Sequence, residues 1–420
     1  MNRRTFFLGA TTAAGSLLAQ ARTLKLGIIG CGWYGGVDAR AAWKAGGVEI
    51  TALCDADTKH LQETASLCAK EQAGRRPALL TRDYKELLDA PGLDGVIIAT
   101  PPHWHALPFI AACDRKLPVY MEKPLAYDIR EGRAMARAQA KAGNLVQVGF
   151  QRRQSAAYKA ARDYLASGAA GRLVQADVQI HYTAGPLDNT PQPPPSTLDW
   201  ELWLGPAPKM PYSPNVAHRA WRLEEKTGNG HLVDWGIHLI DATRTMLGLG
   251  LPKAVTAAGG LYEYKGRITT PDTLTAHFEF DQGPVVWRHR LWGAAEMTPA
   301  YNNGIFLYCE KATIFVTDGR WEVMPKAKGA EKRVTEIRPS TDLGTAHVAE
   351  WLDAIRAQRQ PSCSVEDAWR STTTVQLGMI AYKSGRTLHF DVAGETIKED
   401  VAARKLLLRP YRAPYRHPYA

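Results

Sequence analysis

Residues 25–29, Lys-Leu-Gly-Ile-Ile, lead directly into the hexapeptide Gly30-Cys31-Gly32-Trp33-Tyr34-Gly35, and this junction decides the fold. The apolar run predicts a short buried strand, and small apolar residues at helical spacing over 37–45 predict a helix. Glycines at the first, third and sixth positions of such a turn let the backbone approach a diphosphate at the N-terminus of the helix. The stretch therefore predicts a phosphate-binding strand, turn and helix.

The next predicted strand, residues 48–54, ends at Asp55, about twenty residues after the glycines. A carboxylate there is typical of a site that binds the adenosine ribose diol of a dinucleotide, and it repels a 2′-phosphate. Gly30 then makes the tight turn, Gly32 admits the diphosphate, and Gly35 lets the helix pack close to the strand. We therefore predict an α/β fold with an N-terminal Rossmann domain, a doubly wound parallel sheet that binds NAD rather than NADP. A solvated strand-end residue is the alternative interpretation of Asp55.

Polar clusters follow the other predicted strands of this domain. Buried apolar runs at 96–99, 119–121 and 145–148 each lead into a polar segment. Parallel strands that are buried on both faces form such continuous runs, and ligands bind beyond their carboxyl ends. For His103 and Trp104, core packing is the alternative. The residues predicted to contact the cofactor are Gly30, Cys31, Gly32, Trp33, Tyr34, Gly35, Asp55, Thr100, Pro101, His103, Trp104, His105, Glu122, Lys123, Gln151 and Arg152.

The pattern changes after residue 150. Apolar and polar residues alternate in several short segments, and this alternation is typical of strands with one buried face. We therefore predict a C-terminal α+β domain with a largely antiparallel open sheet, whose exposed face suits a homodimer or homotetramer. Five prolines between 186 and 195 predict a loop, either near the site or inert on the surface. The predicted strands lie at 173–183, 274–280, 285–292, 305–308 and 313–316.

Both ends of the chain carry distinctive segments. Arg3 and Arg4 precede a small-residue apolar stretch that ends in Ala19-Gln20-Ala21, the layout of a cleaved twin-arginine export signal. A lipid-contacting anchor or a chance basic start is the alternative, but the stretch is too short to span a bilayer. At the other end, residues 409–420 predict an extended arm. The predicted divisions are a signal peptide (1–21), the Rossmann domain (22–150), a substrate-binding and oligomerisation domain (151–395) and the arm (396–420), and the predicted location is periplasmic or secreted through the twin-arginine export machinery.

Composition excludes several classes of protein. The 420 residues are 45% hydrophobic and 22% charged, an ordinary globular composition whose length suits two domains. The net charge of +10 comes from scattered Lys and Arg, and without a basic stripe or a binding module we expect no nucleic-acid partner. Six cysteines without CxxC spacing indicate neither a disulfide framework nor a zinc site.

A glycine-rich turn opens the segment 228–241, which continues with the spacing of an amphipathic helix. This helix places Asp234 and His238 one turn apart on one face. An Asp and a His at that spacing often only pair with each other on a helix surface. The spacing alone therefore leaves a catalytic and a structural role open.

The sequence resembles the Gfo/Idh/MocA family, which is named for glucose-fructose oxidoreductase and inositol dehydrogenase. The resemblance rests on the glycine turn, Thr100-Pro101-x-x-x-His105, Glu122-Lys123-Pro124 and Asp234-x-x-x-His238. It extends through Trp203-Leu-Gly-Pro206, Trp221-Arg222, Ala381-Tyr382-x-x-Gly385-Arg386 and Arg412-x-Pro414, over nearly the whole mature chain. It implies an oxidoreductase in which Lys123 orients and polarises the substrate oxygen, while Asp234 and His238 bind the substrate and relay its proton.

The chemistry of these side chains agrees with the implied roles. A hydride leaves a carbinol carbon only as the hydroxyl proton is removed, and histidine accepts protons near neutral pH. An ammonium group beside the oxygen stabilises a developing alkoxide. His231, Asp234 and His238 have a spacing that a metal ion could use, but Lys123 already supplies an electrophile, so we predict no metal. The predicted substrate contacts, with packing as the alternative, are Tyr158, Tyr212, His218, Arg222 and His231.

Export constrains turnover, because no NAD(H) pool exists outside the cytoplasm. The cofactor is therefore expected to stay tightly bound and to be recycled in place, by a second substrate or a separate electron acceptor. We predict an NAD(P)-dependent oxidoreductase that moves a hydride to or from a hydroxyl carbon of a sugar, glycoside or polyol. One alternative is a redox-neutral NAD-dependent glycoside hydrolase that oxidises a ring carbon transiently and eliminates the glycosidic substituent. The other is a dinucleotide-binding scaffold without turnover.

Overall fold

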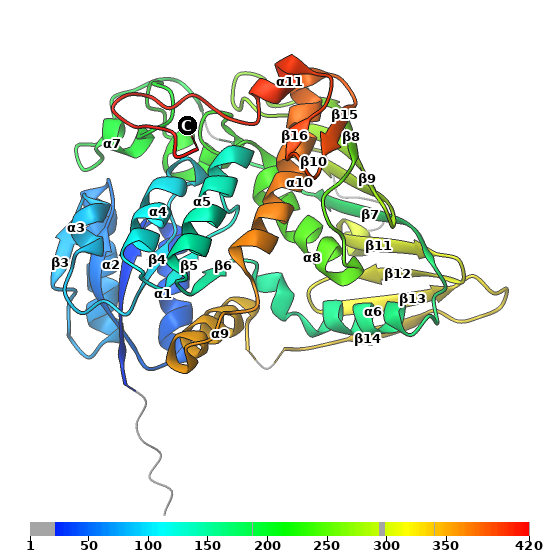
Figure 1. Cartoon of the computed structure of the whole chain (residues 1–420), viewed down its shortest axis with the longest axis horizontal. Helices are drawn as coiled ribbons and strands as arrows, with labels where there is room; N and C mark the ends of the chain where they lie inside the picture. Colours follow the sequence, from blue (N-terminus) through cyan, green and yellow to red (C-terminus); the bar gives the residue numbers. More distant parts are fainter. Residues whose placement is uncertain (1–21, 187, 294–298, 340, 420) are drawn as a thin grey trace, which may run out of the picture.

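The part of the chain that the structure describes forms two β-sheets, one of six strands and one of ten (Figure 1). The structure, a computed structural model, describes residues 22–186, 188–293, 299–339 and 341–419. The predicted signal peptide, 1–21, lies outside the described residues. Among the described helices, none is both long and apolar enough to cross a membrane.

The first sheet contains only parallel strands, in the order β3-β2-β1-β4-β5-β6. Every residue of its last three strands is buried, because helices cover the sheet. The strand order reverses between the first and fourth strands, which is where a Rossmann sheet binds its ligand. The strands are β1 (Leu24–Ile29), β2 (Val48–Cys54), β3 (Leu79–Thr81), β4 (Gly95–Ile98), β5 (Val119–Met121) and β6 (Val146–Val148), and the helices are α1 (Trp33–Ala45), α2 (Thr58–Glu71), α3 (Tyr84–Leu88), α4 (Ala106–Asp114) and α5 (Ile129–Ala142).

The second sheet is mixed and largely antiparallel, in the order β14-β13-β12-β11-β7-β10-β9-β8-β15-β16. Among its described strands, β7 and β10 are parallel neighbours, and the other pairs are antiparallel. Buried and exposed residues alternate along β9, as the sequence predicts. These observations confirm the predicted fold class. The strands are β7 (Leu173–His181), β8 (Ala254–Gly260), β9 (Thr273–Phe280), β10 (Gly283–Arg290), β11 (Asn303–Cys309), β12 (Ala312–Val316), β13 (Arg320–Pro325), β14 (Arg333–Glu336), β15 (Leu388–Asp391) and β16 (Thr396–Ile397).

Helices of the second half pack on this sheet and on the first domain. α6 (Ala156–Ala166), α8 (Ile237–Leu247) and α10 (Val365–Ser384) accompany the second sheet (Figure 1). α9 (Leu343–Ala357) returns to the Rossmann domain, where Trp351 and Leu352 join the apolar cluster of β1 and α1. The apolar face of α9 therefore packs against the first domain.

The C-terminal arm begins after the short helix α11 (Val401–Lys405). It crosses from α11 to the neighbourhood of α7 (Trp200–Leu204) and ends there (Figure 1). Arg409 donates hydrogen bonds to Glu131 at 2.8 Å and to the His103 carbonyl at 2.7 Å. The predicted arm, 396–420, therefore includes β16 and α11, and its described residues after α11, which form no helix or strand, pack over the Rossmann domain of their own chain.

The segment around Asp234, predicted as a regular amphipathic helix, begins with a turn of a different helix type. Residues Leu232–Gly236 form a π-helical turn, and regular α-helix starts only at Ile237. Asp234 and His238 therefore stand on opposite sides of a change in helix type. A π turn widens the helix at this point, and such turns are frequent at functional sites.

Candidate active site and dinucleotide pocket

The three glycines of the turn are required for different reasons. Gly30 has a φ of +94°, and a Cβ there would lie 2.7 Å from the backbone of Thr100. A Cβ on Gly35 would lie 2.0 Å from the Gly30 carbonyl oxygen, so a side chain would push the helix off the strand. A Cβ on Gly32 would meet only the His60 ring, at 3.6 Å. Because the protein itself does not need glycine at 32, this position fits a diphosphate that comes close to the backbone.

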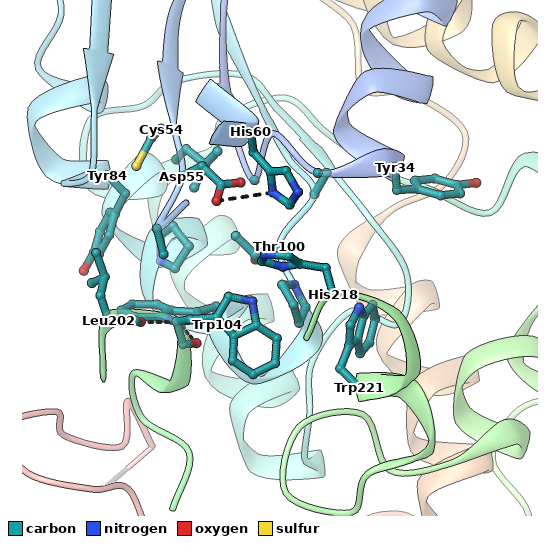
Figure 2. A pocket seen from close by; sticks show the side chains of 18 of the residues that line it. Tyr34, Cys54, Asp55, His60, Tyr84, Thr100, Trp104, Leu202, His218 and Trp221 are labelled. Carbon is teal, nitrogen blue, oxygen red and sulfur yellow. Dashed lines mark hydrogen bonds and ion pairs between the residues drawn. The ribbon is translucent and has the colours of Figure 1, made fainter. Parts of the chain in front are cut away.

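A pocket extends from this turn to the carboxyl ends of the neighbouring strands (Figure 2). Its floor comes from the Rossmann domain and includes the glycine turn, Asp55 and Thr100. Its other wall comes from residues 197–222 of the second half, a segment that we call the roof. The pocket residues of the roof are Leu202, Trp203, His218, Trp221 and Arg222.

Asp55 is held at the closed end of the pocket. Its carboxylate accepts the backbone N–H of Cys31 at 2.7 Å and that of Asp57 at 2.8 Å. The His60 Nδ1 lies 3.7 Å from the carboxylate (Figure 2). These contacts fix a carboxylate in the pocket at the position where a Rossmann domain binds the adenosine ribose.

The roof is joined to the floor by backbone and side-chain hydrogen bonds. Thr58 donates its N–H to the Thr197 carbonyl at 3.0 Å, and Asp199 donates to Ala56 at 3.1 Å. The His218 Nε2 lies 3.1 Å from a carboxylate oxygen of Asp57. The contact brings a predicted substrate residue, His218, to the adenosine end of the pocket rather than to Lys123.

The turn after β4 is also bonded to the roof. The ring nitrogens of His103 and Trp104 each lie 2.9 Å from the Trp203 carbonyl oxygen. His105 makes two hydrogen bonds within the first domain, to the carbonyls of Pro124 and Thr100. Burial lowers the pKa of His103 to about 3 and that of His105 to about 4, so both rings are neutral. Thr100, Pro101 and Trp104 line the pocket, and the two histidines hold the turn from behind.

Lys123 and Asp234 meet where the two domains face each other. The Lys123 Nζ donates to the Asp234 carboxylate at 2.9 Å and to the Asp234 carbonyl at 3.0 Å. The Arg222 Nε lies 3.3 Å from the second carboxylate oxygen of Asp234. One buried carboxylate thus orients two cations, an ammonium and a guanidinium, at the edge of the pocket.

His238 lies near this group without bonding to Asp234 among the described contacts. Burial lowers its pKa well below the ordinary value, and the charges of Lys123 and Arg152 lower it further. Its Nδ1 is buried and has no partner among the described residues. The ring is therefore neutral at neutral pH and offers a buried nitrogen toward which a hydroxyl can hydrogen-bond.

Glu122 and Gln151 connect Lys123 to the glycine turn. Glu122 accepts the backbone N–H of Lys123 at 3.1 Å and the Gln151 amide at 3.0 Å. Burial raises the pKa of Glu122 to about 7, although the Lys123 charge opposes the rise. A Cβ at position 149 would lie 2.5 Å from the Glu122 carboxylate, so Gly149 makes room for it. The Gln151 amide is also 3.5 Å from the Tyr34 hydroxyl.

The remaining predicted site residues lie in three places. Tyr158 donates to Asp318 at 3.1 Å, and Arg152 pairs with the same carboxylate at 3.3 Å. Tyr212 packs edge-on against Trp200 in the roof. His231 is buried beside His289, with ring centroids 4.9 Å apart, and neither of its ring nitrogens has a partner among the described residues. The structure therefore gathers Lys123, Asp234, His238 and Arg222, and it places Tyr158 and Tyr212 in separate packing environments.

Sequence reasoning missed several residues that the structure brings to the site. Asp57 and His60 follow Asp55 at the end of β2, so their position after a strand-end carboxylate was a usable signal. Trp203 belongs to a segment that carries the family resemblance, but nothing in the sequence placed Leu202 or Trp203 at the pocket, because only the tertiary fold carries the roof there. In the described part of the chain, metal-ligating side chains cluster at Asp57, His60 and His218 and at Asp128, Glu131 and His417, and His231, Asp234 and His238 form no such cluster.

Comparisons with known proteins agree with this arrangement. Models described as "Oxidoreductase family, NAD-binding Rossmann fold", "GFO/IDH/MocA C-terminal domain" and "Oxidoreductase family, C-terminal alpha/beta domain" match residues 24–150, 158–315 and 329–417. The chain belongs to the Gfo/Idh/MocA oxidoreductase family. Its first domain is an NAD-binding Rossmann domain, as the glycine turn and Asp55 predict.

Two curated relatives are similar in sequence to this Gfo/Idh/MocA chain. Inositol 2-dehydrogenase of Streptomyces avermitilis is 26% identical over 378 residues, which cover 89% of this chain and 96% of the relative. Levoglucosan dehydrogenase of Pseudarthrobacter phenanthrenivorans is 28% identical over 237 residues, 54% of this chain and 52% of the relative. Both are named as dehydrogenases of a sugar or a polyol.

Solved structures share the fold of this Gfo/Idh/MocA chain. A levoglucosan dehydrogenase in complex with NADH and L-sorbose has a TM-score of 0.69 at 19% identity, and the match covers 88% of this chain and 99% of that one. An oxidoreductase from Agrobacterium radiobacter in complex with NAD+, L-tartaric acid and magnesium has a TM-score of 0.68 at 20% identity, with 89% and 99% covered. Both carry a nicotinamide dinucleotide on the same two-domain fold.

Proposed function

We propose that the chain transfers a hydride to or from a hydroxyl-bearing carbon of a sugar, polyol or glycoside, with an NAD that stays bound between turnovers. The observation that carries this proposal is the Lys123 ammonium, held by Asp234 beside a dinucleotide pocket and next to a neutral histidine. The names of the inositol and levoglucosan dehydrogenase relatives support the substrate class.

The side chains divide the work of the reaction. Bound NAD+ supplies the acceptor for the hydride when an alcohol is oxidised. Lys123 donates to the substrate oxygen and stabilises the negative charge that develops on it. His238, neutral in the resting site, accepts the hydroxyl proton as the C–H bond breaks, so the carbinol becomes a carbonyl. Asp234 keeps Lys123 and Arg222 aimed at the substrate.

The positions of the roof and the arm are the reason to expect that the cofactor is retained between turnovers. The roof covers the pocket from the adenosine end to Arg222. Arg412 of the arm donates to the Gly205 carbonyl at 3.0 Å and 2.9 Å, which fixes the roof from outside. A dinucleotide under this cover leaves slowly, so the reduced cofactor is reoxidised in place. A second substrate with a carbonyl group takes the hydride and a proton and completes the cycle.

A panel of monosaccharides and polyols tests this proposal. Purified protein is denatured to identify the nicotinamide that it retains, and hydride transfer is followed by nicotinamide absorbance in single turnovers. Lys123→Ala is expected to lower the rate of hydride transfer by about 10³-fold while the protein keeps its NAD. Asp55→Ala is the matched control, because it lowers NAD content and spares the group around Lys123. Wild-type rates in Lys123→Ala would contradict the proposal.

The panel also separates the other classes of activity. Glycosides are included, and free sugar is measured beside the absorbance. If free sugar is released without net formation of NADH, the activity is redox-neutral cleavage of the glycoside and not dehydrogenation. Neither signal from any compound would favour a dinucleotide-binding scaffold.

We also propose export in the folded state through the twin-arginine machinery, on the layout of residues 1–21. A folded substrate of this machinery takes up NAD in the cytoplasm and carries it out. Arg3→Lys with Arg4→Lys is expected to leave the protein in the cytoplasm, as cell fractionation measures. Unchanged export of this double variant would contradict the signal.

A further inference from the structure

Exposed aromatic rings are concentrated around Asp234. Four aromatic side chains are among the large apolar residues that the described part of the chain exposes: Trp33 at 73%, Tyr262 at 60%, Tyr182 at 42% and Trp235 at 41%. Three of them, Trp33, Tyr182 and Trp235, flank the residues that surround Asp234. The exposed aliphatic residues, such as Val334 on β14 and Val401 on α11, lie on other elements.

Trp33 stands at the boundary between the cofactor pocket and the catalytic group. It begins α1 inside the glycine turn and lines the pocket. The Arg222 guanidinium carbon lies 6.0 Å from its ring centroid and 4.2 Å from the ring centroid of Trp221. Because Arg222 also binds Asp234, one side chain separates Trp33 from the catalytic carboxylate.

Trp235 and Tyr182 approach the same carboxylate from the second domain. Trp235 follows Asp234 in the π turn, and its ring centroid lies 6.2 Å from that of His238. Tyr182 follows β7, and its ring centroid lies 5.1 Å from that of His231. Burial raises the pKa of the Tyr182 hydroxyl to about 12, and the Asp234 charge adds to the rise, which agrees with their proximity. We call Trp33, Tyr182 and Trp235 the aromatic rim.

The aromatic rim offers more exposed apolar surface than a reacting sugar carbon alone would use. A carbinol carbon needs Lys123, Asp234 and His238, whereas the aromatic rings beside them stay between 41% and 73% exposed in the described fold. Apolar surface that stays exposed and is bordered by polar side chains is typical of a ligand-binding groove. A pyranose matches such a surface, because its C–H face stacks on an aromatic ring while its hydroxyls reach the charged and polar groups alongside.

We propose that the aromatic rim binds a second ring attached to the reacting sugar, so that the substrate is a glycoside rather than a free monosaccharide. This inference rests on the proposed function and narrows its substrate. Hydride transfer takes place on the sugar ring at Lys123, and the glycosidic bond stays intact in that step. The second ring, either another sugar or an aromatic group, stacks on the rim and supplies binding energy away from the reacting carbon.

Paired ligands test the rim without turnover. The Lys123→Ala holoprotein is titrated calorimetrically with methyl and phenyl β-glucosides, with the corresponding galactosides, and with glucose beside cellobiose. Each pair shares one sugar and differs in its second group. The ligand with the second ring is expected to bind about tenfold more tightly than its partner in at least one pair. Equal dissociation constants within every pair would overturn the proposal.

Variants assign the difference to the rim. Trp33→Ala and Trp235→Ala, each in the Lys123→Ala background, are expected to remove most of the tenfold preference. Tyr262→Ala is the matched control, because Tyr262 is an exposed ring on another connection, where its backbone N–H binds Asp272. A preference that survives both tryptophan substitutions would overturn the rim. If Trp33→Ala loses bound NAD but keeps the preference, the rim is also overturned, and Trp33 is then a residue that binds the cofactor.

The same ligands separate this inference from the proposed function. If the wild-type enzyme oxidises monosaccharides and phenyl glycosides with equal kcat/KM, the glycoside inference fails and the oxidoreductase stands. If the preference is present in titration but no compound transfers a hydride, the proposed function fails and the rim stands.

Discussion

The floor and the roof of the dinucleotide pocket are held in shape by different kinds of interaction. The floor is a regular strand, turn and helix, and glycine backbone geometry determines its shape. The roof contains the short helix α7 and irregular segments, and stacked aromatic side chains and hydrogen bonds hold it in place. The floor comes from one continuous stretch, whereas the roof depends on the second half of the chain and on the arm.

This difference separates recognition of the dinucleotide from its release. A backbone cradle and a carboxylate for the ribose are sufficient for binding, and both belong to the floor. The roof covers the bound dinucleotide, so it governs how fast the dinucleotide leaves. Substitutions in the floor are therefore expected to change affinity, and substitutions that loosen the roof are expected to change the release rate.

The largest effect is expected from Gly35→Ala in the floor. The added Cβ would lie 2.0 Å from the Gly30 carbonyl oxygen, so α1 must move away from β1 and the diphosphate cradle opens. We expect NAD affinity to fall by more than about 100-fold, measured by fluorescence titration of apoprotein. Gly36→Ala is the matched control, because its Cβ would meet only the far end of the Arg40 side chain, at 3.4 Å. Wild-type affinity in Gly35→Ala would break the account of the floor.

The contrast also explains what the sequence could predict. The glycine turn, Asp55 and the strands that lead to them were predicted, because buried parallel strands and a glycine turn leave local patterns, whereas His60 was missed. The strand at 173–183 is confirmed as β7, Leu173–His181, from the alternation of its residues. Of the roof, the sequence predicted single substrate contacts such as His218 and Arg222 but not its position over the pocket. That position depends on contacts such as the one between His103 and the Trp203 carbonyl, which no local pattern encodes.

The candidate site shows the same limit at the level of single residues. Spacing left open whether Asp234 only pairs with His238, and the structure pairs Asp234 with Lys123 and Arg222. A π turn changes the directions of these side chains, and a helical pattern in the sequence does not reveal such a turn. The export signal stays a prediction, because residues 1–21 lie outside the described part of the chain, and so does the oligomeric state.

An intermediate effect is expected when the roof is loosened from outside. The Arg412 guanidinium donates to the carbonyls of Gly205 and Glu201 and pairs with the Glu201 side chain. Arg412→Ala is expected to speed NAD release about tenfold, because two or more charge-assisted hydrogen bonds are lost. Stopped-flow displacement of bound NADH measures this rate, and hydride transfer in molecules that still hold NAD should keep its wild-type rate. Arg416→Ala, in the same arm but on an exposed side chain, is the control. An unchanged release rate would show that the arm does not hold the roof.

The smallest effect is a pH response that the floor has and the roof lacks. Where the roof meets the first domain, burial lowers the pKa of His103 to about 3, so this ring stays neutral from pH 8 to pH 6. In the roof itself, burial and the neighbouring His60 lower the pKa of His218. In the floor, burial lowers the pKa of His60, but the nearby Asp55 carboxylate outweighs it and the net pKa is raised. His60 therefore gains a proton as the pH falls through a value above its ordinary 6.5.

Protonation of His60 changes the charge that a 2′-phosphate meets. Neutral His60 leaves Asp55 to repel the phosphate, whereas the imidazolium 3.7 Å from Asp55 offsets that repulsion. We expect NADP affinity to rise about threefold between pH 8 and pH 6, with NAD affinity nearly constant over the same range. His60→Gln should remove the rise, and His277→Gln, on β9 of the second sheet, should keep it. An equal rise for both dinucleotides would place the titrating group elsewhere, because only a charge beside the ribose distinguishes NAD from NADP.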